Sequence, residues 1–142
     1  MSKLYDCFHT ELMYMNRKDH QNLSRSRRLD ISKIRRYKEG DWDFSILNLH
    51  PNLTLEWILE FEEDKWDFQE ISYNSNINET WLQTFPKANW KFEVLSRHSH
   101  INYKWLEAIP DGEWNFQVIT YTKEINIDWL RVVPQGNWDI EK

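Results

Sequence analysis

Glycine, proline and cysteine are scarce in this chain. It has three glycines and four prolines in 142 residues, which argues against a turn-rich β fold and against a disordered chain. The one cysteine, Cys7, excludes an internal disulfide and fits a reducing compartment.

Long apolar runs are also missing. No stretch approaches the ~18 apolar residues that a membrane span needs, and the first six residues, MSKLYD, lack the apolar stretch of a signal peptide. We therefore expect an intracellular protein without a membrane partner.

Aromatic residues are abundant, and the nine tryptophans are regularly spaced. They stand at 42, 57, 66, 81, 90, 105, 114, 129 and 138, with gaps that alternate between 15 and 9 residues. The period is 24 residues with two tryptophans in each repeat, which indicates a tandem-repeat protein.

The same phase divides the chain. Four repeats span 42–65, 66–89, 90–113 and 114–137, and residues 138–142 begin a fifth as a C-terminal stub. Residues 29–41 match the second half of a repeat, with Lys33 at a tryptophan position, and we interpret them as an N-terminal cap. Residues 1–28 form a basic segment, which we expect to be partly helical.

Phenylalanine, leucine and isoleucine recur in phase with the tryptophans, which favours a packed core over a surface on which bases would stack. The predicted core tryptophans are Trp42, Trp57, Trp66, Trp81, Trp90, Trp105, Trp114 and Trp129. A buried indole N–H needs an acceptor, and we expect a backbone carbonyl of the next repeat to provide it.

The second half of each repeat carries signals for a helix start. Counted from the first tryptophan, the thirteenth position holds a residue that favours the N-cap; these residues are Asp30, Thr54, Asn78, Asn102 and Asn126. Three of these helices should stop before a proline, at Pro86, Pro110 and Pro134.

The first half of each repeat predicts a shorter helix, for which Asp67 and Asn115 can cap but Lys91 cannot. Helices this short need neighbours to be stable. The sequence therefore predicts an all-α protein, a short solenoid of 24-residue helix-turn-helix repeats.

Other repeat classes do not fit the pattern. A WD40 blade needs about 40 residues and alternating strands, and tetratricopeptide and ankyrin repeats are about 33 to 34 residues long. Leucine-rich repeats have a period near 24 residues, but their L-x-L strand is absent from this sequence.

The segment Leu47–Ile58, followed by Asp64–Phe68, resembles a Trp-rich repeat that is abundant in large DNA viruses, the mimivirus-like giant viruses. That repeat runs roughly L-S-x-N-P-N-I-T-x-E-x-I and then D-K-P-W-D-W, and Ser72 and Ser96 match its serine. The resemblance covers residues 29–142, although the later repeats lose Asn-Pro and carry the proline before the spacer. It implies a viral repeat protein and no catalytic residues.

We find no constellation that indicates catalysis, a cofactor or a metal. Cys7 and His9 are only two residues apart near a terminus, which does not provide the converging geometry of a nucleophile and its base. His98 and His100 offer two metal ligands, but zinc needs three or four. No glycine-rich phosphate loop is present. We therefore expect a non-enzymatic interaction or scaffold protein, in the virion or the host cytoplasm.

Charge is divided unevenly along the chain. From Arg17 to Lys38 there are nine basic and two acidic residues, and from Trp42 to Lys142 there are eight basic and 17 acidic residues. The basic segment predicts binding of phosphate groups or of an acidic partner, through Arg25, Arg27, Arg28, Arg35 and Arg36. Nucleic acid is the alternative partner, and its contacts should be confined to this end because the acidic remainder repels a polyanion.

Two further surfaces are predicted to bind protein. Variable positions between the two helices of a repeat supply the first, which comprises Tyr73, Arg97, His98, His100 and Tyr121. The second is the C-terminal end, where Trp138 and Ile140 cover the last repeat only in part and a homodimer can form.

Overall fold

A computed structural model describes residues 22–138, and every regular element in this range is helical. The all-α prediction is therefore confirmed for this part of the chain. Residues 22–25 are helical, and the elements that follow are α3 (Ile31–Arg36), α4 (Phe44–Leu47), α5 (Leu55–Glu60), the 3-10 helix η1 (Glu63–Lys65), α6 (Phe68–Ile71), α7 (Glu79–Thr84), α8 (Phe92–Ser96), α9 (Tyr103–Ala108), α10 (Phe116–Thr122) and α11 (Ile127–Val132).

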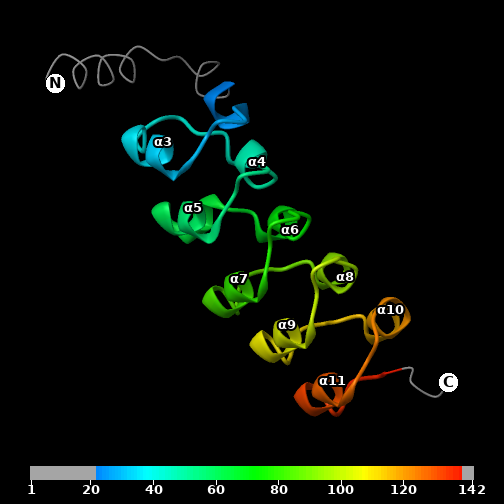
Figure 1. Cartoon of the computed structure of the whole chain (residues 1–142). Coiled ribbons are helices and arrows are strands. Elements are labelled where there is room, and N and C mark those ends of the chain that lie inside the picture. The colour runs from blue at the N-terminus through cyan, green and yellow to red at the C-terminus, as the bar shows by residue number, and fades with distance from the viewer. Residues whose placement is uncertain (1–21, 139–142) are drawn as a thin grey trace, which may run out of the picture. The chain divides into compact units, whose positions relative to one another are not determined.

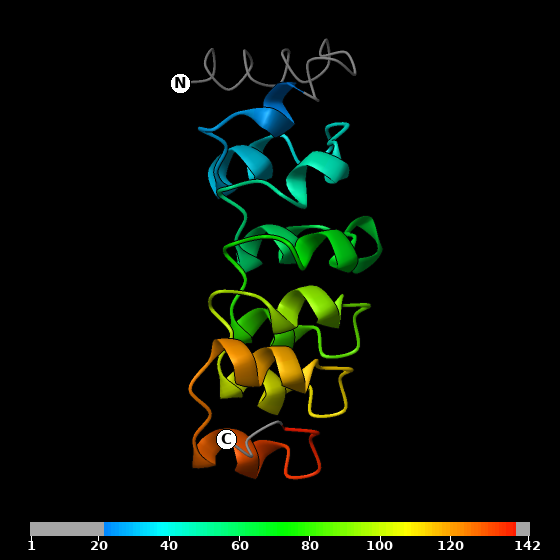
Figure 2. The same ribbon diagram turned by 90° about the vertical axis from the view of Figure 1, so that its right-hand side faces the viewer.

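The chain forms two compact units, Met1–Trp66 and Asp67–Lys142. In the first unit, α3 packs against α5. In the second, α9 lies between α7 and α11, and α8 packs against α10, so the helices form two rows (Figure 1). The turned view shows the short loops that connect the two rows (Figure 2).

The predicted N-caps hold the start of each second helix. Asn78, Asn102 and Asn126 each accept a hydrogen bond, of 2.9–3.0 Å, from the backbone N–H two residues further on. Asp30 caps α3 by accepting from the Lys33 N–H, whereas Thr54 precedes α5 without a side-chain bond. The caps satisfy donors that have no partner within the helix.

The first helices are also capped as their sequences predict. The Asp67 carboxylate accepts from the N–H groups of Gln69 and Glu70, and the Asn115 side chain accepts from the Val118 N–H. Lys91 makes no cap bond at the start of α8.

The first tryptophan of each repeat joins two repeats through its indole N–H. The acceptor carbonyl belongs to the preceding repeat, so the prediction that the next repeat would supply it is wrong. The bonds run from Trp42 to Tyr37 (3.1 Å), from Trp66 to Ile58 (3.0 Å), from Trp90 to Phe85 (2.8 Å), from Trp114 to Ile109 (2.8 Å) and from Trp138 to Val133 (3.0 Å). The short chain between donor and acceptor makes the preceding carbonyl the nearer partner.

Trp66 differs from the other four because its acceptor lies eight residues upstream rather than five. The residue after α5, Phe61, has extended backbone angles (φ −116°, ψ 167°), and Glu62 follows it where later repeats have a proline. The 3-10 helix η1 then leads into Trp66. The indole N–H of Trp66 therefore donates to the carbonyl of Ile58 and not to that of Phe61, which lies five residues upstream.

Four of these tryptophans, all except Trp42, also pack edge-on against a phenylalanine of the preceding repeat. The interplanar angles lie between 69° and 89°, and the ring centroids are 5.1 Å apart for Phe44–Trp66, 5.0 Å for Phe68–Trp90, 5.0 Å for Phe92–Trp114 and 4.8 Å for Phe116–Trp138. Such aromatic pairs stabilise a core by about 0.5–1.5 kcal/mol beyond area burial. The eight tryptophans from Trp42 to Trp129 are all buried, with at most 7% of each exposed.

A buried serine forms a second link between repeats. Where the seventh position is a serine, its hydroxyl accepts from the backbone N–H at the second position of the following repeat; in repeat 42–65 this position is Asn48. The three links are Asp43 N–H to Ser24 (3.1 Å), Lys91 N–H to Ser72 (2.9 Å) and Asn115 N–H to Ser96 (2.8 Å). These serines have no exposed surface, so their bonds replace water that the N–H groups would otherwise require.

Removal of one serine hydroxyl should therefore destabilise the protein. We expect Ser96→Ala to lower the free energy of unfolding by about 1–3 kcal/mol, because the part-buried N–H of Asn115 loses its acceptor. Urea unfolding followed by far-UV circular dichroism measures the change. Ser99→Ala, at an exposed position of the same repeat, is the control, and equal losses in the two variants would contradict the link.

Candidate functional site

Three exposed side chains recur every 24 residues at the end of the first helices of the second unit. Tyr73 follows α6, Arg97 follows α8 and Tyr121 lies in the last turn of α10. They project because the residues one or two places before them, such as Ile71 and Leu95, are buried in the core. Tyr73 is 53% exposed and Tyr121 is 92% exposed. We name this set the Tyr–Arg column.

Lys91 of α8's N-cap stands beside the first member of the column. Its ammonium donates a hydrogen bond of 2.9 Å to the Tyr73 hydroxyl and lies 5.2 Å from the centre of the Tyr73 ring. The hydrogen bond, together with the electrostatic interaction with Tyr73, raises the pKa of Lys91. The side chain that cannot cap α8 therefore orients an exposed tyrosine instead.

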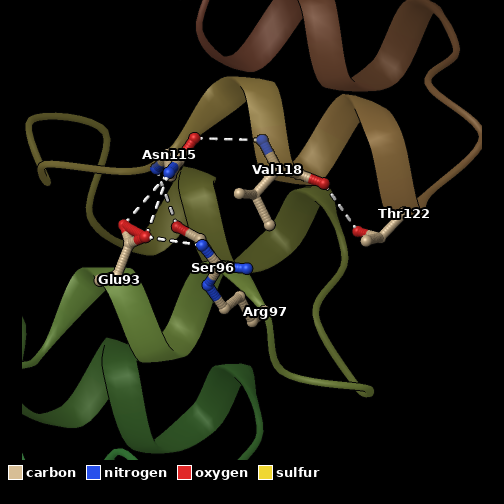
Figure 3. Close-up of polar contacts among 6 residues, drawn as sticks. All are labelled: Glu93, Ser96, Arg97, Asn115, Val118 and Thr122. Carbon is tan, nitrogen blue, oxygen red and sulfur yellow. Dashed lines mark hydrogen bonds and ion pairs between the residues drawn. The ribbon is translucent and has the colours of Figure 1, made fainter.

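Glu93 occupies the centre of a polar network next to Arg97 (Figure 3). It accepts hydrogen bonds from the Asn115 amide, at 3.2 and 3.1 Å to its two oxygens, and from the Arg97 guanidinium at 3.0 Å. These donors, Asn115 first, lower the pKa of Glu93. Asn115 meanwhile caps α10, so the network ties Arg97 to two neighbouring helices.

His98 faces inward, unlike the other residues predicted for this surface. Its Nε2 lies 3.0 Å from the carbonyl oxygen of Asn74, and its Nδ1 accepts from the His100 N–H at 3.1 Å. A carbonyl can only accept, so the neutral Nε2–H form satisfies both bonds. His50 is bound in the same way to Ser26 and Asn52, at 2.8 and 3.0 Å.

His98 therefore holds the loop between the two helices rather than offering a binding group. Its ring lies 5.0 Å from that of Trp105, and burial lowers its pKa, aided by the charges of His100 and Lys123. His100 itself is exposed, with its ring 5.4 Å from that of His98.

The basic residues of the first unit divide into two groups. Arg25, Arg27 and Arg28 are exposed and make no ion pair with a described residue. Arg35 is engaged by α5, at 3.7 Å from Glu56 and 3.3 Å from Glu60. Arg36 and Lys38 are exposed on and after α3.

The loop that carries Arg27 and Arg28 is held by the repeat that follows. The Asn52 amide donates to the carbonyls of Arg27 and Leu29, at 2.7 and 3.1 Å, and the Lys33 ammonium donates to the carbonyl of Arg28 at 2.8 Å. The backbone of this basic loop is therefore fixed while its guanidinium groups face solvent.

The C-terminal repeat is less well covered than the others. Ile125 and Leu130 are partly exposed, whereas their equivalents Ile101 and Leu106 are buried. Trp138 is half-buried against Phe116 and Trp129, and Ile140 lies outside the described residues, as do Cys7 and His9.

Within residues 22–138, no group of three or more His, Cys, Asp or Glu side chains is placed to bind a metal ion. The helices of this range are also too short and too polar to cross a membrane.

The sequence did not point to Lys91, Glu93 or Asn115 as surface residues. A signal existed only for Lys91, which stands where Asp43, Asp67 and Asn115 cap the other first helices. The partner of Glu93 lies 22 residues away on another helix, which a linear pattern does not reveal.

Comparison with known proteins adds no relative. No family model matches the sequence, and no curated protein and no solved structure is similar to it.

Protonation of His98 should destabilise the fold. Because its pKa is lowered from the ordinary value of 6.5, the folded protein binds this proton less readily than the unfolded chain does. Stability should be complete above pH 6.5 and should fall as the pH drops below that value. Urea unfolding between pH 8 and 5 measures this dependence.

The variant His98→Asn should flatten the decline, because Asn74 occupies the equivalent position and accepts from the Asn76 N–H at 2.9 Å. His100→Asn, which changes an exposed ring, is the control. A decline that persists unchanged in His98→Asn would show that other groups cause it.

Proposed function

We propose that this protein is a non-enzymatic interaction or scaffold protein, built as a short solenoid of 24-residue αα repeats. The Tyr–Arg column carries the proposal, because Tyr73, Arg97 and Tyr121 project in register from helices that are fixed to one another. Tyrosine and arginine are enriched among residues that dominate binding energy at protein interfaces. Their large exposed areas favour a protein partner.

The indole and serine links support the solenoid. Within each unit, the same bonds recur at 24-residue spacing and join each repeat to its neighbour, as nearest-neighbour repeats require. The polar clusters are accounted for by capping and linking, as Glu93 and His98 illustrate, which favours a structural role over a catalytic one.

The resemblance of residues 29–142 to the repeat of giant viruses supports a viral origin. We therefore infer a component of the virus particle or a virus-encoded adaptor, which acts in the virion or in the host cytoplasm. The residues that carry this inference are the segment Leu47–Ile58 and the Asp64–Phe68 segment after it.

A second copy of this chain is also a candidate partner. Ile127 is 57% exposed on α11, and the adjacent Asp128 and Arg131 have opposite charges. Two α11 helices in antiparallel contact would bury both apolar faces and pair Asp128 with Arg131 of the other copy.

Loss of the Tyr–Arg column should remove the partner but keep the fold. We expect the triple variant Tyr73→Ala, Arg97→Ala, Tyr121→Ala to change the free energy of unfolding by at most about 0.5 kcal/mol per substitution, as is usual for exposed side chains. Quantitative mass spectrometry of cross-linked, tagged protein from the host cell measures binding.

The control carries Gln83→Ala, Lys104→Ala and Glu107→Ala on exposed positions of α7 and α9. The native protein and the control should recover the same partner, and the triple variant should lose it. The proposal is contradicted if the native protein, the triple variant and the control all recover the same cross-linked proteins.

Nucleic-acid binding is the second candidate function, and the exposure of Arg25, Arg27 and Arg28 favours it. One guanidinium group at the end of the helical residues 22–25 and two on the fixed loop that follows match the spacing-tolerant, sequence-independent contacts that proteins make with phosphates. The carboxylates of the rest of the chain would confine the contact to this loop.

The salt dependence of binding to a labelled 20-base-pair DNA duplex tests this function. The slope of log K against log salt is negative, and its magnitude should fall by about 0.9 for each phosphate contact removed. The variant Arg25→Gln, Arg27→Gln, Arg28→Gln should therefore reduce the magnitude of the slope by about 2–3. Arg35→Gln is the control because that residue is paired with Glu60. Absent binding, or binding that high salt leaves unchanged, would reject the candidate.

A further inference from the structure

A shallow groove runs along the first helices of the second unit. It consists of two adjoining hollows, with volumes of about 630 and 370 Å³, which share Glu93 and Glu113. Each hollow is formed by the start of one first helix and by the residue before its tryptophan. The groove therefore repeats its construction once for each 24-residue repeat.

Each hollow contains one aromatic pair within a lining whose exposed surface is otherwise mostly polar. Phe92 and Trp90 line the first hollow, and Phe116 and Trp114 line the second. The two tryptophans are buried, whereas both phenylalanine rings are partly exposed. A ligand can therefore reach two apolar patches, one in each repeat.

The backbone at Gly112 packs directly against the aromatic pair of the first hollow. A Cβ atom at this position would lie 2.4 Å from Cε1 of Phe92 and 2.9 Å from Nε1 of Trp114. A residue with a side chain would therefore displace the Phe92 ring that lines this hollow.

The rim is polar and varies in charge along the groove. Carboxylates stand in the middle, at Glu93 and Glu113, and side-chain amides stand at both ends, at Gln69, Asn89, Gln117 and Asn137. Lys87, Lys91 and Asp111 also line the first hollow, whereas the second hollow contains no basic residue. Glu113 is exposed and makes no ion pair with a described residue.

We propose that this groove binds a peptide in the extended polyproline II conformation, in which a lysine or arginine stands between two apolar side chains. Packed helices lie about 8–10 Å apart, and a polyproline II chain has three residues per turn and rises about 3.1 Å per residue. Side chains three residues apart in the peptide would therefore lie on one face and meet successive repeats. The inference rests on the proposed function of protein binding and names the chemistry of the partner.

Each part of the peptide has a matching part of the groove. The two apolar side chains contact Phe92 and Phe116, and the basic side chain lies between Glu93 and Glu113. Because Arg97 already neutralises part of the charge of Glu93, Glu113 provides most of the attraction. The amides at the ends can donate to and accept from the peptide backbone, while the central carboxylates disfavour an acidic peptide or a nucleic acid.

Fluorescence anisotropy with a labelled peptide, Gly-Ser-Leu-Ala-Lys-Leu-Ser-Gly, tests the proposal. We expect the peptide to bind the full chain, and we expect about tenfold or greater loss when glutamate replaces its lysine or serine replaces both leucines. Glu113→Lys in the protein should cause a similar loss, since it places like charges together. Circular dichroism verifies that the variant is folded.

Glu107→Lys is the matched control because it makes the same charge change on an exposed position of α9 that lines neither hollow. It should bind the peptide as the native chain does. The indole N–H signals of Trp90 and Trp114, observed by NMR, should shift on binding, while that of Trp81 should not.

The proposal is overturned if the native chain does not bind the lysine peptide, if Glu107→Lys and Glu113→Lys lose affinity equally, or if the peptide with glutamate in place of lysine binds as tightly. Those results leave the proposed function intact as long as the Tyr–Arg column variant still loses its cellular partner. Both proposals are refuted if the Tyr–Arg column variant keeps its cellular partner and Glu113→Lys keeps its affinity for the peptide.

Discussion

Hydrogen bonds that cross from one repeat to the next are the constraint on which this structure depends. The described α-helices contain only four to seven residues, and helices of this length are unstable in water by themselves. Two donors, a buried indole N–H and a part-buried backbone N–H, have their acceptors in the preceding repeat. Leaving either one unpaired in the interior would cost a large part of the stability of a small domain, so these links define the spacing and orientation of neighbouring repeats.

Much of the local structure could be predicted from residue types in phase. Asn78, Asn102 and Asn126 start helices where the pattern placed them, because capping depends on one side chain and the two or three residues after it. The tryptophans lie in the interior because a ring that recurs with the apolar residues must share their face. The repeat period and the helix caps depend only on residues close together in the chain, so both can be predicted from the sequence alone.

The tertiary partners could not be predicted in this way. The acceptor of the indole was expected in the wrong repeat, since the direction of a side chain depends on how the chain turns after each second helix. The extended backbone at Phe61 shows how one residue moves that acceptor. The surface was foreseen as variable positions, but the inward turn of His98 and the network around Glu93 arise from packing between helices.

The functional proposals follow from the division between fixed and variable positions. The side chains that make the links are tryptophan and serine, whereas the surface positions change their chemistry from one repeat to the next. The described residues therefore carry chemically different surfaces on one framework: arginine in the first unit, tyrosine and arginine in the second, and carboxylates along the groove. Such a framework can alter its binding chemistry without altering its core.

The serine link has a consequence for how such a chain can change in length. It always joins the seventh position of one repeat to the second position of the following one, so its geometry contains no reference to how many repeats come before. After duplication or deletion of a block of 24 residues, each remaining serine would still lie opposite the backbone N–H of a second position and could accept its hydrogen bond. A block of another size placed between the two bonded positions would put a different residue opposite the serine, whereas growth by whole repeats conserves the buried bonds.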